Sequence, residues 1–132
     1  VLGMALEVVA DNQKKVFAEA GLREKEGFIT TGLWSISRHP NYLGEIMLWT
    51  GLSLIAYNGV KDNPDCPLPS AAFASPAVTY MLLNFLSGIP MLEARAKHKW
   101  GADPRYQQYV KRTPVLLPTV ASILAAAKGK KN

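Results

Sequence analysis

The stretch Pro76–Leu92 reads PAVTYMLLNFLSGIPML, seventeen residues without one charged side chain. As a helix it would be about 25 Å long, close to the roughly 30 Å hydrocarbon core of a bilayer. Earlier in the chain lies another apolar run, Tyr42–Tyr57, which has sixteen residues of which only Glu45 is charged. In chain order, Tyr42–Tyr57 is the first run and Pro76–Leu92 is the second. We therefore expect two membrane-spanning helices, and two buried core helices of a soluble domain are the alternative.

The basic residues flank these two runs. The chain has fifteen Lys and Arg residues and a formal net charge of +5. Only Lys61 lies in the connector between the runs, and the other fourteen lie before the first run or after the second. By the positive-inside rule, both flanks face the cytoplasm and the connector faces the opposite side. Nucleic acid would also attract basic residues, but it would not explain why they flank membrane-length runs, so we expect membrane lipids and no nucleic acid as partners.

Proline and glycine mark where the helices begin and bend. Pro40 suits the first turn of a helix that contains the first apolar run. Gly88 and Pro90 should kink the second spanning helix, because Pro90 removes a backbone hydrogen bond. Asp103 and Pro104 are typical of an N-cap and a first turn, and they predict a short helix after the second span.

The expected fold is all-α, a multi-pass integral membrane helical bundle. It has about two full spanning helices, a partial one at residues 1–10 and a short cytoplasmic amphipathic helix. We expect residues 1–120 to form this C-terminal membrane domain of a larger protein, and residues 121–132 to form a basic, flexible tail. Lys128 and Lys130 resemble a dilysine retrieval signal, which would place a eukaryotic protein in the endoplasmic reticulum membrane with its C-terminus in the cytoplasm.

Metal chemistry is not indicated. The single cysteine, Cys66, excludes an internal disulfide bond. Together with His39 and His98 it shows no spacing typical of metal ligands, so we expect no metal site. Candidate functional residues are therefore charged, amide and aromatic side chains near the cytoplasmic ends of the helices.

The densest polar cluster, Ser37–Glu45, reads SRHPNYLGE. Arg38 and His39 come just before a helix N-terminus, where backbone N–H donors and the positive end of the helix dipole attract anions. The pattern predicts a site for phosphate oxygens at the membrane surface.

The same cluster continues into the helix. Asn41 and Glu45 are four residues apart and share one helix face. Gly44 between them lets another backbone or a flat ring approach closely. A carboxylate within an apolar run is costly and usually functional, so Glu45 is a candidate catalytic or cofactor-binding residue. The alternative is a structural ion pair between Glu45 and a basic residue such as Arg95.

Two further clusters lie outside the spanning runs. Asp11 and Lys14 lie about one turn apart on the first helix, although a solvated helix end has the same pattern. Arg105, Tyr109 and Arg112 are spaced to line one face of the last cytoplasmic helix. An aromatic ring between two guanidinium groups could stack on an adenine and neutralise phosphates. The alternative is an interfacial helix that the same side chains anchor at the lipid headgroups.

In this order along the chain, the clusters resemble the steroid 5α-reductase-like superfamily, and specifically its DUF1295 branch. The likeness covers about Glu7–Pro118, and its most specific part is Arg38-His39-Pro40-Asn41-Tyr42-x-Gly44-Glu45. The other matching stretches are Glu7-x-x-Ala10-Asp11-x-Gln13-Lys14, Gly32-Leu33-Trp34-x-x-Ser37, Ser87-Gly88-Ile89-Pro90-x-Leu92-Glu93 and Tyr106-x-x-Tyr109-x-x-Arg112-Thr113.

The resemblance implies NADPH in a cytoplasm-facing pocket and a lipophilic, steroid- or lipid-like substrate. Hydride would pass from the reduced nicotinamide to an activated carbon–carbon double bond, and the acid that polarises the substrate is expected upstream of this chain. One departure is Ala18, where relatives with sterol-reductase activity often have an arginine. The cofactor contacts that the resemblance implies are Asp11, Lys14, Arg38, His39, Asn41, Tyr42, Glu45, Arg95, Tyr106, Tyr109 and Arg112.

Two alternatives stay open at this point. A membrane methyltransferase of the isoprenylcysteine or phospholipid type would use S-adenosylmethionine and shares the Arg-His-Pro-x-Tyr-x-Gly pattern. Asn41, Glu45 and the earlier cluster at Asp11 argue against it. A non-catalytic membrane protein that keeps the cofactor fold is the second alternative, and the departure at Ala18 favours it.

Overall fold

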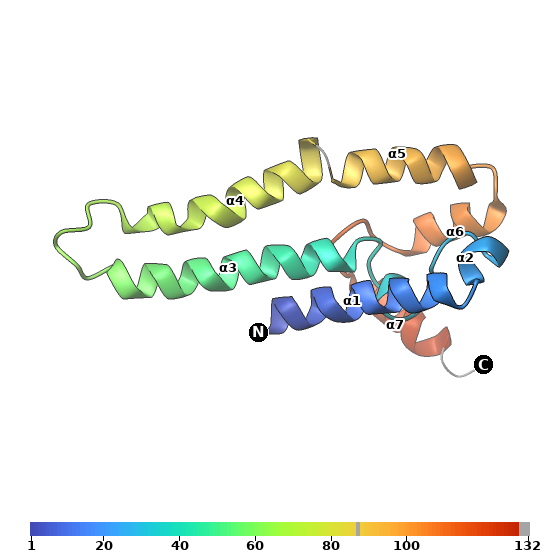
Figure 1. Ribbon diagram of the computed structural model, residues 1–132, viewed down its shortest axis with the longest axis horizontal. Coiled ribbons are helices and arrows are strands. Elements are labelled where there is room, and N and C mark those ends of the chain that lie inside the picture. Colours follow the sequence, from blue (N-terminus) through green and yellow to red (C-terminus); the bar gives the residue numbers. More distant parts are fainter. Residues whose placement is uncertain (87, 130–132) are drawn as a thin grey trace.

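The computed structural model describes residues 1–86 and 88–129, and all regular structure in these residues is helical. This confirms the all-α expectation. A long arm projects from the molecule, formed by two helices that lie antiparallel and side by side (Figure 1). The arm consists of α3 (Pro40–Val60) and α4 (Ala74–Met81), and the short helix η2 (Pro69–Phe73) belongs to the connection at its tip.

One helical run is long and apolar enough to cross a membrane. It extends from Pro69 to Trp100 and passes Ser87, which lies outside the described residues. Only 12% of its most apolar window is buried within the chain. The expected break near Gly88 is present, because this residue separates the π-helical segment η3 (Leu82–Leu86) from α5 (Ile89–Trp100).

The sequence predicts two full spans, whereas within the described residues this run is the one that has the required length and hydropathy. Helix α3 is 21 residues long, which is enough to span a bilayer. Its mean hydropathy is lower because Asn41, Glu45, Thr50, Ser53 and Asn58 interrupt the apolar residues. The multi-pass arrangement therefore stays a prediction.

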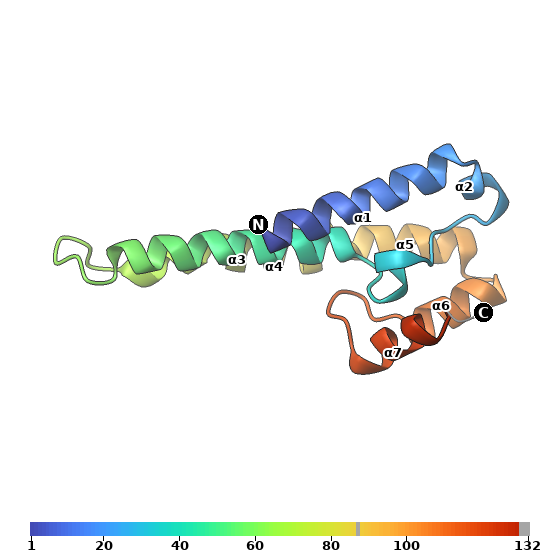
Figure 2. The same cartoon turned by 90° about the horizontal axis from the view of Figure 1, so that it is seen from below.

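The end of the molecule opposite the arm tip is formed by short helices, and we call it the head. It comprises residues 20–39 and 101–129 together with the end of α5. Helix α1 runs beside the first part of α3 toward the head, and Figure 2 shows α1 and α7 on opposite sides of the beginning of α3. Besides η3 and α5, the helices outside the arm are α1 (Leu2–Glu19), α2 (Leu22–Lys25), η1 (Gly32–Ser35), α6 (Pro104–Arg112) and α7 (Val120–Gly129).

Helices α1 and α3 cross with their backbones in contact. A Cβ atom on Gly44 would lie 2.7 Å from the backbone nitrogen of Glu7 and 2.7 Å from the carbonyl oxygen of Gly3. A Cβ atom on Gly3 would lie 2.5 Å from the backbone nitrogen of Leu48. The prediction that Gly44 admits a close neighbour is confirmed, and the neighbour is the backbone of α1.

Aromatic rings form the core of the head. The ring of Phe28 lies 5.5 Å from that of Trp100, 5.3 Å from that of Tyr106 and 5.9 Å from that of Tyr109, measured between centroids. Gly27 has a φ of +86°, and a Cβ atom on it would lie 2.7 Å from Nε1 of Trp100, so this turn requires glycine. The core holds the end of α5 against α6.

The C-terminal residues differ from the tail predicted over 121–132, because α7 is helical as far as Gly129. Thr119 and Ser122 cap the start of this helix reciprocally: the backbone nitrogen of each donates to the hydroxyl oxygen of the other, at 3.0 Å and 3.2 Å. Ser122 is 1% exposed. The first turn of α7 is therefore part of the head, and Lys130 of the predicted retrieval signal lies outside the described residues.

Candidate functional site

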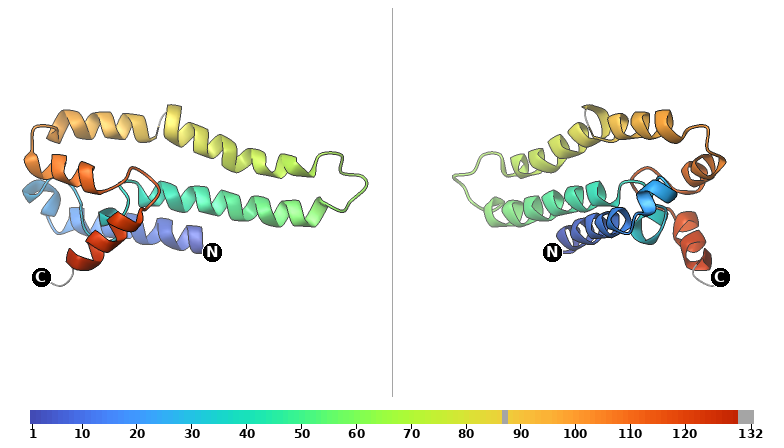
Figure 3. Two further views of the ribbon diagram at one scale, coloured as in Figure 1. Left: turned by 180° about the vertical axis from the view of Figure 1, so that it is seen from behind. Right: turned by 45° about the vertical axis from the view of Figure 1, so that its right-hand side comes forward.

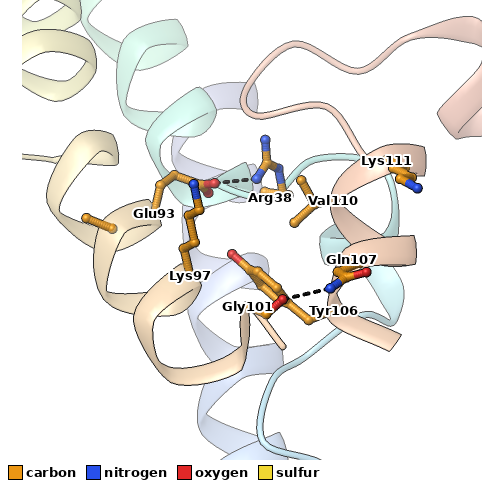
Figure 4. Close-up of a pocket in the computed structure, with 9 residues that line it drawn as sticks. Arg38, Glu93, Lys97, Gly101, Tyr106, Gln107, Val110 and Lys111 are labelled. Carbon is orange, nitrogen blue, oxygen red and sulfur yellow. Dashed lines mark hydrogen bonds and ion pairs between the residues drawn. The ribbon is translucent and has the colours of Figure 1, made fainter. Parts of the chain in front are cut away.

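A cavity of about 460 Å³ lies between α5 and α6 in the head (Figure 4). Three cationic side chains line it: Arg38 from the turn before α3, Lys97 from α5 and Lys111 from α6. Tyr106 contributes an aromatic ring from α6. The other lining residues are Glu93, Ala94, Gly101, Gln107 and Val110.

Local contacts fix the position of α6 beside the cavity. The carboxylate of Asp103 accepts a hydrogen bond from the backbone nitrogen of Arg105 at 2.8 Å, which confirms the predicted N-cap. Gln107 Nε2 donates to the carbonyl oxygen of Gly101 at 2.9 Å and fastens α6 to the end of α5. These bonds allow Tyr106 to line the cavity at a fixed place.

Tyr109 faces the protein interior. It is 6% exposed, and its hydroxyl donates to the carbonyl oxygen of Trp34 at 2.7 Å. Burial raises the pKa of Tyr109, so the phenol stays protonated and remains a donor. The predicted stack of Arg105, Tyr109 and Arg112 on one open face is therefore not formed, and Arg105 pairs instead with Asp103.

One carboxylate holds the turn that precedes α3. Arg38 Nη1 donates to Glu93 Oε2, and His39 Nε2 donates to Glu93 Oε1 at 2.8 Å. The side chains of Arg38 and His39 are 11% and 8% exposed, and that of Glu93 is 26% exposed. The ring of His39 also stacks on that of Tyr42, with centroids 5.6 Å apart. Glu93 thus links the cavity to the first turn of α3.

The backbone of the same turn is held from the other side. The backbone nitrogen of Arg38 donates to the carbonyl oxygen of Pro114 at 2.9 Å, and Ser37 Oγ donates to that of Leu116 at 2.7 Å. Within the described residues, Nε of Arg38 and Oδ1 of Asn41 are buried without a hydrogen-bond partner. Buried polar atoms usually have partners, so this donor and this acceptor are exceptions at the start of α3.

A second group of predicted residues lies where α1 meets α3. Asp11 and Glu45 lie within electrostatic range of Glu7 and of Tyr42. Among the residues that the structure describes, Glu45 forms no ion pair with Arg95, which is exposed on α5. The structural alternative for Glu45 is therefore not formed.

The predicted residues are thus divided among several surroundings. Arg38 and Tyr106 line the cavity, and His39 is joined to it through Glu93. The Nζ atom of Lys14 lies 5.3 Å from the centroid of the Trp34 ring. Those at the α1–α3 contact or on the first turns of α3 are Asp11, Asn41, Tyr42 and Glu45, and those exposed on α5 and α6 are Arg95 and Arg112.

The sequence groups Glu93, Lys97 and Lys111 with Arg95 in a charged cluster after the second apolar run, but they were not assigned as cofactor contacts, and all three line the cavity. Glu93 and Lys97 are four residues apart on α5, so their shared helix face was a usable signal. The partners of Glu93 were not predictable, because Arg38 and His39 lie 55 and 54 positions away in the chain.

Comparison with known proteins places these features in one family. No curated protein and no solved structure matches the chain. A family model described as "Protein of unknown function (DUF1295)" matches residues 1–113. The matched part includes the α1–α3 contact, the arm and every residue that lines the cavity. The chain therefore belongs to the DUF1295 family.

Proposed function

We propose that this chain is the cofactor-binding part of a multi-pass membrane reductase that uses NADPH to reduce an activated carbon–carbon double bond. The substrate is lipophilic, steroid-like or lipid-like. The observation that carries the proposal is the cavity that Arg38, Lys97 and Lys111 line together with Tyr106. The resemblance of the Arg38–Glu45 segment to steroid 5α-reductase-like proteins supports the same assignment.

The residues present fit a dinucleotide carrying several phosphates. Cationic side chains form short, strong hydrogen bonds with phosphate oxygens, and the cavity offers three of them. Glu93 offsets part of the charge of Arg38, so Lys97 and Lys111 supply the remaining positive charge. The buried Nε of Arg38 is a further donor, and Tyr106, which is 6% exposed, contributes an aromatic side chain to the cavity wall.

The membrane part of the proposal rests on exposure and charge. The apolar run Pro69–Trp100 is little buried within the chain, unlike the core helix of a soluble protein. Large apolar side chains of α3 are exposed beside it, among them Leu52 and Ile55 at 48% and 72%. With the basic residues concentrated at the head end, the positive-inside rule places the head in the cytoplasm. In a eukaryote, Lys128 and Lys130 would direct the protein to the endoplasmic reticulum membrane.

The cofactor and the residues of this chain have separate roles in the proposed reaction. When bound, the reduced nicotinamide supplies the hydride. Arg38, Lys97 and Lys111 would bind and orient the phosphates. Asn41 and Glu45 are further contacts that the family resemblance implies. The acid that polarises the substrate belongs to the helices upstream. The residues of this chain therefore act by binding, orientation and exclusion of water.

The test is NADPH binding by the intact membrane protein in detergent, followed by fluorescence titration with competitors. We expect NADPH to bind, and NADH to bind about tenfold or more weakly because it lacks one phosphate for the cationic side chains. S-adenosylmethionine should not displace NADPH. Binding of S-adenosylmethionine without an NADPH signal would instead identify a methyltransferase, and binding of neither would favour the non-catalytic alternative.

A further inference from the structure

Helix α7 is attached at the level where α3 begins. Ser122 Oγ donates to the carbonyl oxygen of Ile36 at 3.1 Å, and Ser37 Oγ donates to that of Leu116 at 2.7 Å. Ile36 and Ser37 come just before α3, whose apolar run begins at Tyr42. The surface of the proposed bilayer crosses the chain at this point, so α7 lies at the level of the lipid headgroups. Figure 3 shows α7 at the head, close to the beginning of α3.

The face of α7 opposite Ser122 is apolar and uncovered. Val120, Ile123 and Leu124 are 74%, 50% and 55% exposed, and Leu117 just before the helix is 68% exposed. Positions 120 and 124 are four residues apart and lie on one helix face, so they form a continuous apolar strip. Ser122 is 1% exposed and anchors the opposite face to the protein. The apolar strip is therefore accessible from outside the protein.

We propose that the apolar strip of α7 binds the cytoplasmic surface of an anionic lipid bilayer, with Val120 and Leu124 at the boundary between headgroups and acyl chains. Two properties identify lipid as the occupant. The strip lies at the level where the membrane-spanning arm begins, and it is followed by Lys128 in the last turn of α7 and by Lys130 and Lys131 in the sequence. Apolar side chains flanked by lysines match the interface of an anionic leaflet.

This inference rests on the membrane placement in the proposed function. It goes further, because it assigns a lipid-binding role to a helix that lies outside both the arm and the cavity. Binding of α7 to the bilayer would also fix the position of the preceding segment 114–116 relative to the membrane. This segment accepts hydrogen bonds from Ser37 and Arg38. The cavity would then be held at a constant height above the bilayer.

The experiment places an environment-sensitive fluorophore on single cysteines of the intact protein in a cysteine-free background, which includes Cys66→Ser. Leu124→Cys reports on the strip, Phe85→Cys on the apolar run Pro69–Trp100 at η3, and Gln108→Cys on an exposed position of α6. The labelled proteins are reconstituted in vesicles of phosphatidylcholine and phosphatidylglycerol. Emission is then quenched in turn by nitroxides attached to lipid and by aqueous iodide. Val120→Cys replaces Leu124→Cys if that variant does not fold.

We expect nitroxides near the headgroups to quench the label at position 124 several-fold more strongly than the label at 108, and iodide to do the reverse. Omitting phosphatidylglycerol should weaken quenching of the label at position 124 by lipid nitroxides, and should leave lipid quenching of the label at position 85 unchanged. Quenching at 124 by iodide alone, or by neither agent, would overturn the proposal, because water or protein would then cover the strip. Loss of lipid quenching at 85 would instead overturn the membrane placement itself.

Discussion

The Nε2 atom of His39 lies 2.8 Å from Oε1 of Glu93, so a carboxylate on α5 holds the turn from which α3 begins. The other oxygen of Glu93 accepts a hydrogen bond from Arg38. Because the side chains of Arg38 and His39 are 11% and 8% exposed, these bonds form largely out of water. The wall of the cavity therefore depends on a contact between residues far apart in the sequence.

Replacing Glu93 should destabilise the protein. In Glu93→Ala the guanidinium of Arg38 stays largely buried but loses its charged partner. For such a partly exposed pair we expect the free energy of unfolding to fall by about 2 kcal/mol. We expect a lower melting temperature of the intact protein in detergent, measured by thermal unfolding, and weaker NADPH binding because Arg38 is no longer held in place.

The matched control for this variant is Glu19→Ala. Glu19 pairs with Lys15 on the surface of α1, where both side chains are more than half exposed, so its loss should cost less than about 0.5 kcal/mol. Equal melting temperatures for the two variants would show that Glu93 does not hold the turn.

Gly44→Ala should disrupt the α1–α3 contact. The added methyl group would lie 2.7 Å from two backbone atoms of α1, which cannot move as a flexible side chain would, so we expect a loss of about 1–3 kcal/mol. Gly51→Ala on the same helix is the control, because a Cβ atom there meets nothing within 4 Å. That control should be neutral or stabilising. Unfolding measurements that rank the two variants in the opposite order would contradict the observed helix crossing.

Tyr109→Phe should reveal a dependence on pH. The variant leaves the carbonyl oxygen of Trp34 without its donor, which costs about 1 kcal/mol at neutral pH. Burial raises the pKa of Tyr109 in the folded state, so the stability due to this hydroxyl is fully present below the unfolded value of about 10 and declines as the pH rises above it.

Thermal unfolding across this range checks the prediction. The loss of stability in Tyr109→Phe relative to the wild type should become smaller above about pH 10. Tyr80→Phe, at an exposed position of α4, is the control and should show no deficit. A deficit of Tyr109→Phe that is independent of pH would show that the phenol is not held in its protonated form.

Much of the fold could be predicted because its signals are local. Pro40 and the Asp103–Pro104 pair mark helix starts through their own backbone preferences, and both helices begin where these residues predict. Helix α7 was missed because Thr119 and Ser122 resemble ordinary loop residues until each caps the other. A span formed by α3 stays a prediction, because Glu45 and polar residues such as Asn41, Ser53 and Asn58 lower the mean hydropathy of this helix.

The candidate site was less predictable than the fold. Arg38 was identified from its place just before a helix N-terminus and Tyr106 from the family resemblance, and both line the cavity. Tyr109 was assigned to the same open face, but helical spacing alone does not tell which side of α6 faces the aromatic core. The role of Glu93 could not be predicted, because its partners Arg38 and His39 are distant in the sequence and meet it only in the folded chain. The spacing of residues in the sequence shows which of them share a helix face. Tertiary packing then determines whether that face lies against the protein interior or toward the solvent.

The most direct test of the central claim compares NADPH binding by two double variants of equal net charge. Lys97→Ala with Lys111→Ala removes two charges from the cavity, whereas Lys15→Ala with Lys25→Ala removes two exposed charges elsewhere. A charge-assisted hydrogen bond contributes about 1.5–3 kcal/mol, and about 1.4 kcal/mol corresponds to a tenfold change in affinity. We predict that the cavity variant binds NADPH at least about tenfold more weakly than the control variant, which should match the wild type. Equal affinities in the two variants would contradict the assignment of this cavity to the cofactor.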